Sequence, residues 1–504
     1  MQPSLRSPQL VFVLALALGV CADRLFIGRW LGISVVLFVG ALLLVLVGLG
    51  RHEGAAPTRA NLWLGGAALL FAGLVAVRDN PLLVTLNVLA VLGLLLLQAA
   101  LYRGPALSKL SAGQTLLSAI NAVLNITYRA VPLTGQAIQA MPLQRGQLGA
   151  VIPLARGLAL SVPVLLVFGG LLVSADTVFA SYVNGIFNFD FDWDVDIASL
   201  IGHTMVALGV AWACAGGLVV ALTGAAAPAL PKELPAEGDT QRLAALPTSW
   251  RFLGWVEALT VLSLVDLLFA VFMMIQGAYL FGGMNTLERT GMTFAEYARR
   301  GFFELLTVAC LALALLWCLA LFTKRDKQQT RIFNLASGAM VVLVIGMLLS
   351  AFQRMLLYEQ AYGFTELRVY TLSFMIWLAV VLGLFLVALV RDRPRVFVLG
   401  SFVTALVYLA LLNLANTDAL IVRANVARYE QTGKLDAWYL TTLSADAVPD
   451  LAAAYSRVDP SSQELLREHF QWRRARLQEE QERQGWPAWR LARSRALAAL
   501  NQMP

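Results

Sequence analysis

The residues best placed to do chemistry in this sequence are charged side chains inside long apolar runs. Asp266 stands in the middle of VLSLVDLLFAVF, with apolar residues on both sides. An ionised carboxylate at the centre of a bilayer costs a few kcal/mol, so Asp266 must face protein or water, or carry a proton. We therefore treat Asp266 as a candidate proton or cation relay. The alternative is a buried, hydrogen-bonded acid that joins two helices.

A second group of charges opens another apolar run, in EYARRGFFELL at 296–306. Glu296 lies four residues before Arg300 and Glu304 lies four residues after it. A helix would therefore place a carboxylate one turn above and one turn below Arg300, with Arg299 beside it.

The segment SAFQRMLLYEQAYGFTELRVY at 350–370 repeats this mixture of arginine, tyrosine and acid. Arg354, Tyr358 and Tyr362 share one helical face with Thr365 close by, and the segment ends in Glu366 and Arg368. We predict that these helix ends converge into a polar site formed by Arg299, Arg300, Glu304, Arg354, Tyr358 and Arg368. The alternative is that the arginines snorkel and the tyrosines anchor helices at the membrane interface.

Other kinds of chemistry find little support. The chain has no GxxxxGK[ST], HExxH or GxSxG motif, and its three histidines are far apart in sequence. All four cysteines lie in apolar runs, where they act as small hydrophobic residues. FNFDFDWDVDI at 187–197 has a DxDxD spacing that suggests calcium, but it lacks the glycine and the distal glutamate of an EF-hand. We expect no metal and no cofactor, and an intramembrane enzyme is disfavoured.

The composition is that of a membrane protein. The 504 residues are 59% hydrophobic and only 14% charged, whereas soluble proteins carry about 25% charged residues. The formal net charge is +7, but the basic residues are spread over short connections between apolar runs. This distribution fits membrane orientation and argues against nucleic acid as a partner.

The apolar runs predict an all-α, polytopic integral membrane bundle of about eleven helices, since a bilayer core of about 30 Å needs roughly 20 apolar residues. The predicted cores are 9–25, 31–49, 60–77, 82–102, 153–174, 197–222, 252–276, 301–323, 332–352, 370–390 and 396–414. The first run is interpreted as a retained helix and not as a cleaved signal, because Val20 before Cys21 is too large for a lipoprotein cleavage site.

The connections predict the orientation. Residues 175–196 contain several aspartates and no basic residue, so we place them outside the cytoplasm. The basic segments KRDKQQTR and RDRPR then fall in the cytoplasm together with the N-terminus. The C-terminal region falls on the opposite side, periplasmic or extracellular, and this assignment depends on the first helix being a span.

Four regions follow from these boundaries. Residues 1–224 form an N-terminal membrane region of about six spans, with an amphipathic surface segment near 105–141 that is either a docking helix or a linker with its apolar face in the headgroups. Residues 225–250 are a cytoplasmic Pro-rich linker, 251–414 a C-terminal membrane region of about five spans, and 415–504 a small external helical domain.

Several sequence blocks carry a resemblance to a known family. They are ADRLFIG at 22–28, SADTVF at 174–179, QGAYLFGG at 276–283, AEYARRGFFELL at 295–306, YGFTELRVYTLSFMIW at 362–377, NTDALIVRANVARY at 416–429 and DAWYLTTLSADAVPDL at 436–451. The chain resembles the uncharacterised bacterial membrane family known as domain of unknown function forty-one seventy-three. In that family a proline is expected where this chain has Thr417.

The resemblance implies a multi-pass protein of the bacterial inner membrane with no established activity. Two hypotheses for function remain open. The first is transport or ligand handling, with Asp266 as a relay and the arginine-rich cluster as an outer site. The second is a membrane scaffold or sensor whose C-terminal domain binds a protein partner.

Overall fold

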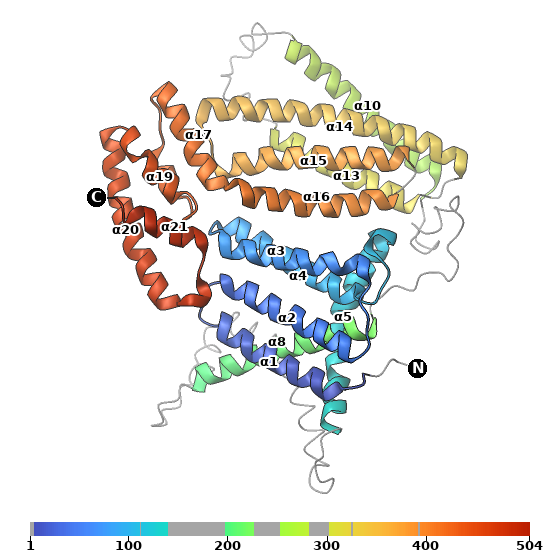
Figure 1. The fold of residues 1–504 in the computed structure, drawn as a ribbon. Coiled ribbons are helices and arrows are strands. Elements are labelled where there is room, and N and C mark those ends of the chain that lie inside the picture. The colour runs from blue at the N-terminus through green and yellow to red at the C-terminus, as the bar shows by residue number, and fades with distance from the viewer. Residues whose placement is uncertain are drawn as a thin grey trace, which may run out of the picture. The chain divides into compact units, whose positions relative to one another are not determined.

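The computed structural model describes residues 5–110, 112–139, 197–225, 253–281, 302–323, 326–391 and 394–503. This part of the chain is helical and contains no β-strand, only an isolated bridge between Leu253 and Thr323. Ten of its helices are long and apolar enough to cross a membrane. The predicted all-α, multi-pass membrane bundle is therefore confirmed (Figure 1).

The helices differ in character along the chain. Nine of these candidate spans are α1 (Pro8–Phe26), α2 (Ile33–His52), α3 (Leu62–Val77), α4 (Pro81–Leu101), α8 (Ile197–Thr223), α10 (Trp255–Phe281), α14 (Lys327–Tyr362), α15 (Glu366–Val390) and α16 (Pro394–Ala415). The tenth lies in the amphipathic helix α5 (Ala112–Gln139), which follows α4. The helix α13 (Phe302–Phe322) is also apolar, but its stretch Leu305–Ala320 is shorter than the candidate spans. The C-terminal helices are α17 (Thr417–Thr432), α18 (Ala437–Thr441), α19 (Val448–Ala454), α20 (Pro460–Gln484) and α21 (Leu491–Leu500). Short 3-10 turns are η1 (Arg59–Asn61), η2 (Leu107–Lys109), η4 (Tyr455–Arg457) and η5 (Trp486–Ala488).

Each predicted apolar run that falls in the described part of the chain coincides with one of these helices. The run 153–174, nearly all of the linker 225–250 and nearly all of the segment 187–197 lie outside the described residues. One helix is longer than predicted, because α14 has 36 residues and is about 54 Å long. The tyrosines after residue 352 therefore continue the same helix, which ends at Gly363 with φ +80°.

Contacts divide the chain into two compact units, which are described separately. Unit 1 comprises Met1–Leu107, Thr115–Leu230 and Ala475–Ser494. Unit 2 comprises Ser108–Gln114, Pro231–Arg474 and Arg495–Pro504. The predicted C-terminal domain 415–504 thus contributes residues to both units, and its boundaries stay a prediction.

In unit 1, α1 and α8 pack most extensively against one another. Gly19 of α1 makes this possible, because a Cβ at that position would lie 2.2 Å from the Ala207 carbonyl oxygen and 2.7 Å from the Ala211 Cβ. Small residues at such crossings let the backbones of membrane helices approach closely. Local sequence also sets the start of α4, where the Asn80 side chain accepts hydrogen bonds from the Leu82 and Leu83 N–H groups and Pro81 follows as the first helical residue.

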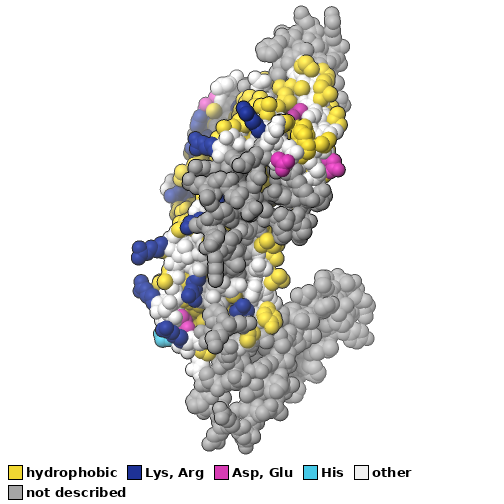
Figure 2. All heavy atoms as spheres, turned by 90° about the vertical axis from the view of Figure 1, so that its right-hand side faces the viewer, with side chains coloured by type: hydrophobic (Ala, Val, Ile, Leu, Met, Phe, Trp, Pro, Cys, Tyr) yellow, Lys and Arg dark blue, Asp and Glu magenta, His cyan; other side chains and the backbone are white. Residues whose placement is uncertain are grey.

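One end of unit 1 collects the N-terminal segment and several helix connections. The Glu53 carboxylate accepts hydrogen bonds from the backbone N–H groups of Arg6 at 2.6 Å and Ser7 at 2.9 Å. Arg103, after α4, donates to the Leu222 carbonyl oxygen of α8 at 2.9 Å. We call this the N-terminal end of unit 1, and Figure 2 looks onto it and shows Lys and Arg side chains there.

The opposite end of unit 1 holds the connections α1–α2 and α3–α4 together with the C-terminal residues 475–494. The His203 Nδ1 lies 2.7 Å from the Asp23 Oδ1, which places the start of α8 beside the end of α1. The Ile33 N–H donates to the Trp489 carbonyl oxygen at 3.0 Å. The helices of unit 1 therefore alternate in direction as predicted, whereas the side of the membrane that each end faces stays a prediction.

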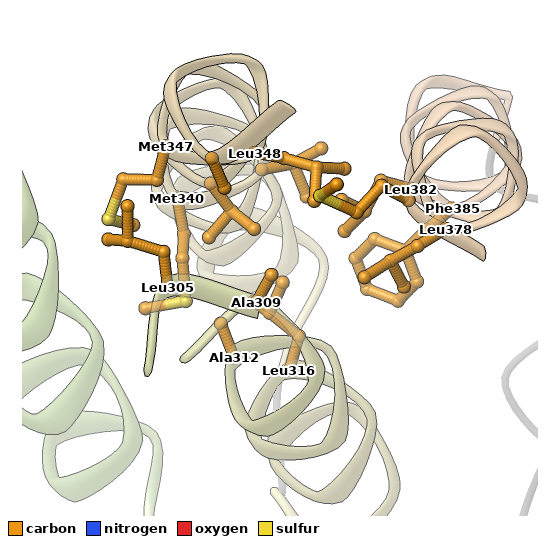
Figure 3. Close-up of a cluster of buried hydrophobic side chains, with 14 of the residues drawn as sticks. Leu305, Ala309, Ala312, Leu316, Met340, Met347, Leu348, Leu378, Leu382 and Phe385 are labelled. Carbon is orange, nitrogen blue, oxygen red and sulfur yellow. The ribbon is translucent and has the colours of Figure 1, made fainter. Parts of the chain in front are cut away.

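Unit 2 has a core between α13, α14 and α15 (Figure 3). Ala309 and Ala312 of α13 face Met340 of α14 with their side chains almost fully buried, and these small residues allow the helices to approach closely. Larger side chains fill the space between α14 and α15. The labelled members of this cluster are Leu305, Ala309, Ala312, Leu316, Met340, Met347, Leu348, Leu378, Leu382 and Phe385.

The start of α20 depends on an N-cap carboxylate outside the membrane spans, and this predicts a pH dependence. Hydrogen bonds from Ser461 and Ser462 to Asp459 lower the pKa of that carboxyl from 3.8 to about 2. Because the folded-state pKa is the lower one, the stabilisation is present above pH 3.8 and is lost as the pH falls toward 2. We expect the acid midpoint of α20, followed by circular dichroism or hydrogen exchange, to shift in Asp459→Asn. An unchanged acid profile would contradict the proposed cap.

Candidate functional site

Asp266 lies halfway along α10 and is half-buried. Its Oδ1 atom is buried and has no hydrogen-bond partner among the described residues. Neighbouring side chains of α10 such as Leu264, Leu267 and Leu268 are exposed on the helix surface, as expected for a helix in contact with lipid. The Asp266 Oδ1 therefore points away from the exposed leucine face of α10 and has no hydrogen-bond partner among the described residues.

The charges of EYARRGFFELL are only partly within the described chain. Arg299 and Arg300 lie outside the described residues. Glu304 lies in the first turn of α13, and its side chain is also outside the described part. The predicted bracketing of Arg300 by two carboxylates therefore stays a prediction.

Of the residues predicted in the segment 350–370, Tyr358 and Arg368 are in contact. The Arg368 guanidinium of α15 lies over the Tyr358 ring of α14, with its carbon 4.2 Å from the ring centroid. Arg368 also donates a hydrogen bond to the Gly363 carbonyl oxygen. The Tyr358 and Tyr362 rings are 5.0 Å apart between centroids. We call Tyr358, Glu359, Tyr362, Gly363 and Arg368 the arginine corner.

Two residues of α14, Glu359 in the arginine corner and Arg354 beside it, have charged side chains that are largely buried. Arg354, one turn before Tyr358, is only 9% exposed. Glu359 is only 3% exposed, and its Oε1 atom has no hydrogen-bond partner among the described residues. Glu359 was not predicted as a site residue, because it lies seven residues beyond the predicted run 332–352 and hydropathy gave no signal that the helix continues there.

Asp266 and Glu359 are far apart, as the packing of α10 on α14 shows. The Met273 methyl carbon lies 2.9 Å from the position that a Cβ on Gly346 would take, so these residues are level with one another. Asp266 precedes Met273 by seven residues and Glu359 follows Gly346 by thirteen. Both helices run the same way from the Leu253–Thr323 bridge, so the two carboxylates are separated by about 30 Å along the helix axes.

The connection after the arginine corner is held by α17. The Asn425 side chain accepts a hydrogen bond from the Phe364 N–H at 3.0 Å and donates one to the Phe364 carbonyl oxygen at 2.8 Å. A Cβ on Gly363 would lie 2.5 Å from the Asn425 Oδ1. The positive φ of Gly363 and this close approach both require glycine here.

Tyr439 of α18 lies beside the same turn. Its hydroxyl oxygen accepts a hydrogen bond from the Glu366 N–H at 2.8 Å. Burial raises the pKa of Tyr439, and the carboxylates of Glu366 and Asp418 add to this effect while Arg368 opposes it. The Tyr439 phenol is therefore neutral at ordinary pH and sits among charges from α15 and α17.

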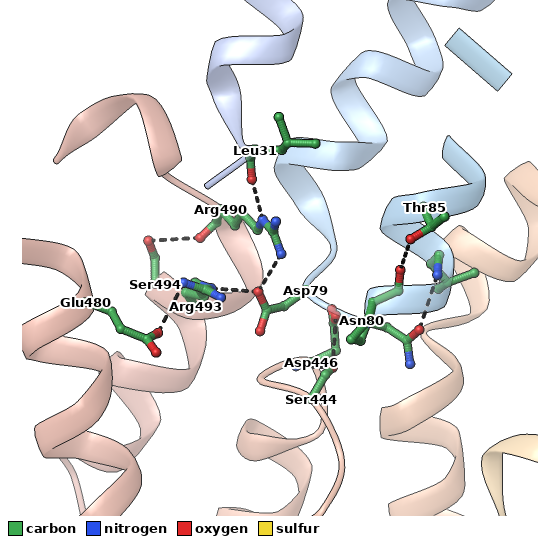
Figure 4. A network of polar contacts seen from close by, with 12 residues as sticks. Leu31, Asp79, Asn80, Thr85, Ser444, Asp446, Glu480, Arg490, Arg493 and Ser494 are labelled. Atoms are coloured by element: carbon green, nitrogen blue, oxygen red, sulfur yellow. Dashed lines mark hydrogen bonds and ion pairs between the residues drawn. The ribbon is translucent and has the colours of Figure 1, made fainter. Parts of the chain in front are cut away.

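Unit 1 contains a separate polar network that joins the C-terminal residues 475–494 to two helix connections (Figure 4). The Asp79 Oδ1 accepts hydrogen bonds from Arg490 Nη1 at 2.8 Å and from Arg493 Nε at 2.6 Å. The Asp79 and Arg490 side chains are only 8% and 9% exposed. Arg493 also stacks on Trp30, with its guanidinium carbon 4.1 Å from the ring centroid, and donates to Glu480 at 3.3 Å.

A comparison with protein families identifies the chain. A family model described as a domain of unknown function (DUF4153) matches residues 64–454. The chain belongs to this family. The predicted membership of an uncharacterised family is confirmed, but the number forty-one seventy-three is corrected to 4153. Searches of curated proteins and of solved structures each found no match.

The DUF4153 match covers the arginine corner and Tyr439 but neither α1 nor the residues of the C-terminal network beyond 454. The blocks YGFTELRVY, NTDALIVRANVARY and DAWYLTTLSADAVPDL, which are separate in sequence, meet around Phe364, Asn425 and Tyr439. No metal-binding group of three or more His, Cys, Asp or Glu residues occurs within the described ranges.

Asn425 is expected to be important for the stability of this DUF4153 member. Asn425→Ala would remove its hydrogen bonds and leave the Phe364 backbone groups without their partner, so the free energy of unfolding should fall by about 1–3 kcal/mol. Unfolding of the purified protein in mixed micelles measures this loss. The exposed amide of Asn501 in unit 2 provides the control, and equal stability of Asn425→Ala and Asn501→Ala would contradict the assignment.

Proposed function

We propose that this DUF4153 protein carries out proton- or cation-linked transport, using Asp266 and Glu359 as ionisable groups along unit 2. The supporting observation is that each presents a buried carboxylate oxygen with no hydrogen-bond partner among the described residues. Asp266, in the middle of a span, needs a proton, a cation or water, because an isolated carboxylate in hydrocarbon is costly. Ionisable residues in this position mark ion pathways in many membrane proteins. Glu359 also interacts with the charge of Arg368.

The separation of the two acids supports a path and argues against a single site. They lie about 30 Å apart on neighbouring helices that run in the same direction. With Asp266 in the middle of its span, Glu359 then lies at or beyond the edge of a bilayer core about 30 Å thick. Asp266 would serve as the relay within the span. Glu359 would exchange its proton or cation near the end of α14.

The arginine corner would form the ligand-handling end of this path. Arg368 is held by the Tyr358 ring and by the Gly363 carbonyl oxygen, so its charge is positioned before any ligand arrives. Arg354 adds a second buried positive charge one turn deeper. The orientation predicted from the sequence places this end outside the cytoplasm, in an inner-membrane protein whose N-terminus is cytoplasmic.

The test is ion flux in proteoliposomes that contain the purified full chain. Asp266→Asn and Glu359→Gln are each expected to reduce proton or cation flux at least 10-fold, while expression and the unfolding midpoint stay close to those of the wild type. Glu257→Gln is the matched control, because Glu257 lies at the exposed start of α10 and accepts a hydrogen bond from the Gly254 N–H at 2.9 Å. Loss of folding together with flux in both variants would make the two acids structural.

The alternative, a scaffold or sensor that binds a protein partner, is supported by a different observation. Several tryptophans of the C-terminal region are largely exposed, with exposed fractions of 67% for Trp438, 51% for Trp472 and 63% for Trp486. Exposed aromatic side chains are common at protein interfaces. The same proteoliposome experiment separates the two functions, because a scaffold predicts no flux above that of empty liposomes for the wild type.

A further inference from the structure

The amphipathic helix α5 has three distinct faces. One face packs inside unit 1 through the buried residues Ser118, Ala122, Ala130 and Leu133. A second face is apolar and exposed; its members are Leu116, Leu117, Ile120, Val123, Leu124 and Tyr128, each at least 46% exposed. Six large apolar side chains on one face are poorly suited to water.

The third face of α5 is polar and lies next to the exposed apolar face. The Asn125 side chain donates to the Asn121 carbonyl oxygen at 2.7 Å, and the Arg129 Nε donates to the Asn125 Oδ1 at 2.8 Å. These residues follow one another at a spacing of four along the helix and therefore form a continuous stripe. An apolar arc bordered by a polar stripe is typical of helices that lie in the membrane interface.

The position of α5 in unit 1 matches that interpretation. A Cβ on Gly216 of α8 would lie 1.9 Å from the Ile126 carbonyl oxygen, so α5 and α8 cross in direct backbone contact. Gly216 is seven residues before the end of α8 at Thr223, which is about 10 Å along the helix axis. Amphipathic helices in membrane interfaces are buried to about 5–10 Å.

The direction of α5 differs from that of the spans. Figure 1 shows α5 running across the end of unit 1 near the N-terminus, at a steep angle to the axes of α1 to α4. Ala130 and Leu133 pack in a cluster with Val11 of α1 and Leu49 of α2 at this end. A helix placed across the ends of the spans does not cross the bilayer.

We propose that α5 docks on the lipid surface, with its exposed apolar face in the boundary between headgroups and acyl chains and its Asn121–Arg129 stripe toward water. The residues 113–134 are apolar enough to span, but their mean hydropathy of 1.2 is the lowest among the candidate spans of the described chain. A spanning α5 would place Asn121, Asn125 and Arg129 in hydrocarbon, which is costly. The partner of this face is the membrane that the protein itself spans.

Nitroxide depth measurements on the full chain in nanodiscs test this proposal. The four native cysteines are first replaced with alanine, and the variant is checked for monodispersity. Single labels are then attached at Leu116→Cys, Ile120→Cys, Leu124→Cys and Tyr128→Cys, all of which are exposed positions. Leu70→Cys, exposed on α3, serves as the reference for a deep, lipid-facing site. Asn121→Cys serves as the reference for the polar stripe.

Oxygen and a water-soluble nickel reagent report the depth of each label. We expect the four apolar-face labels to have nearly the same shallow depth, with Leu70→Cys deeper and Asn121→Cys accessible to nickel. A spanning helix would instead separate the labels at 116 and 128 by about 18 Å. Labels shielded from both reagents would show that protein covers this face. The proposal would be overturned by such shielding, and equally by a large difference in depth between the labels at 116 and 128.

Discussion

Asp79→Ala is expected to lower the free energy of unfolding by about 3–5 kcal/mol, because it removes the shared partner of two arginines and leaves a charge buried. Arg490 and Arg493 both donate to the Asp79 Oδ1, and the Arg490 side chain is only 9% exposed. Denaturant titration in mixed micelles, followed by tryptophan fluorescence, measures the loss. The residues 475–494 are expected to become accessible to protease in the same variant, since this network holds them to unit 1.

An exposed ion pair provides the control for Asp79→Ala. Arg457 and Glu430 have side chains that are 53% and 47% exposed, and surface pairs of this kind contribute little. Glu430→Ala should therefore leave the unfolding curve unchanged. If Asp79→Ala and Glu430→Ala give the same curve, the C-terminal network does not hold the unit together.

Gly216→Ala is expected to have the second large effect. Its new methyl group would overlap the Ile126 carbonyl oxygen, and because that atom belongs to the backbone, α5 and α8 would have to move apart. Overpacking of this kind costs about 1–3 kcal/mol, and occasionally more. Thermal unfolding of the purified protein in detergent measures the difference from the wild type.

The adjacent glycine is a matched control for this substitution. A Cβ on Gly217 would have no atom within 4 Å, and alanine is the better helix former by about 1 kcal/mol in soluble helices. Gly217→Ala should therefore be neutral or slightly stabilising. Equal melting temperatures for Gly216→Ala and Gly217→Ala would contradict the close crossing of α5 and α8.

The spans could be predicted from the sequence because a bilayer core requires apolar runs of a defined length. Apolar runs do not predict the full length of α14. Arg354, Tyr358 and Glu359 interrupt the apolar pattern there, although the helix continues to Tyr362. Hydropathy locates the part of a helix that lies in hydrocarbon. It does not show where the helix ends.

The candidate site could be predicted only in part. Tyr358 and Arg368 lie ten residues apart in sequence, and a single helix–turn–helix unit brings them together, so local spacing was sufficient. Asp79 and Arg490 are separated by 411 residues, and no local pattern relates them. The neighbours of Tyr439 depend in the same way on three blocks that only the folded chain brings together.

The proposed transport function requires that Asp266 and Glu359 face a protein-lined path containing water or ions. A cryo-EM map of the full chain in nanodiscs, at a resolution that shows ordered water, tests it most directly. The proposed function predicts density for water or a cation within hydrogen-bonding distance of the Asp266 Oδ1 and the Glu359 Oε1. Both carboxylates packed dry against lipid chains or apolar side chains would contradict it.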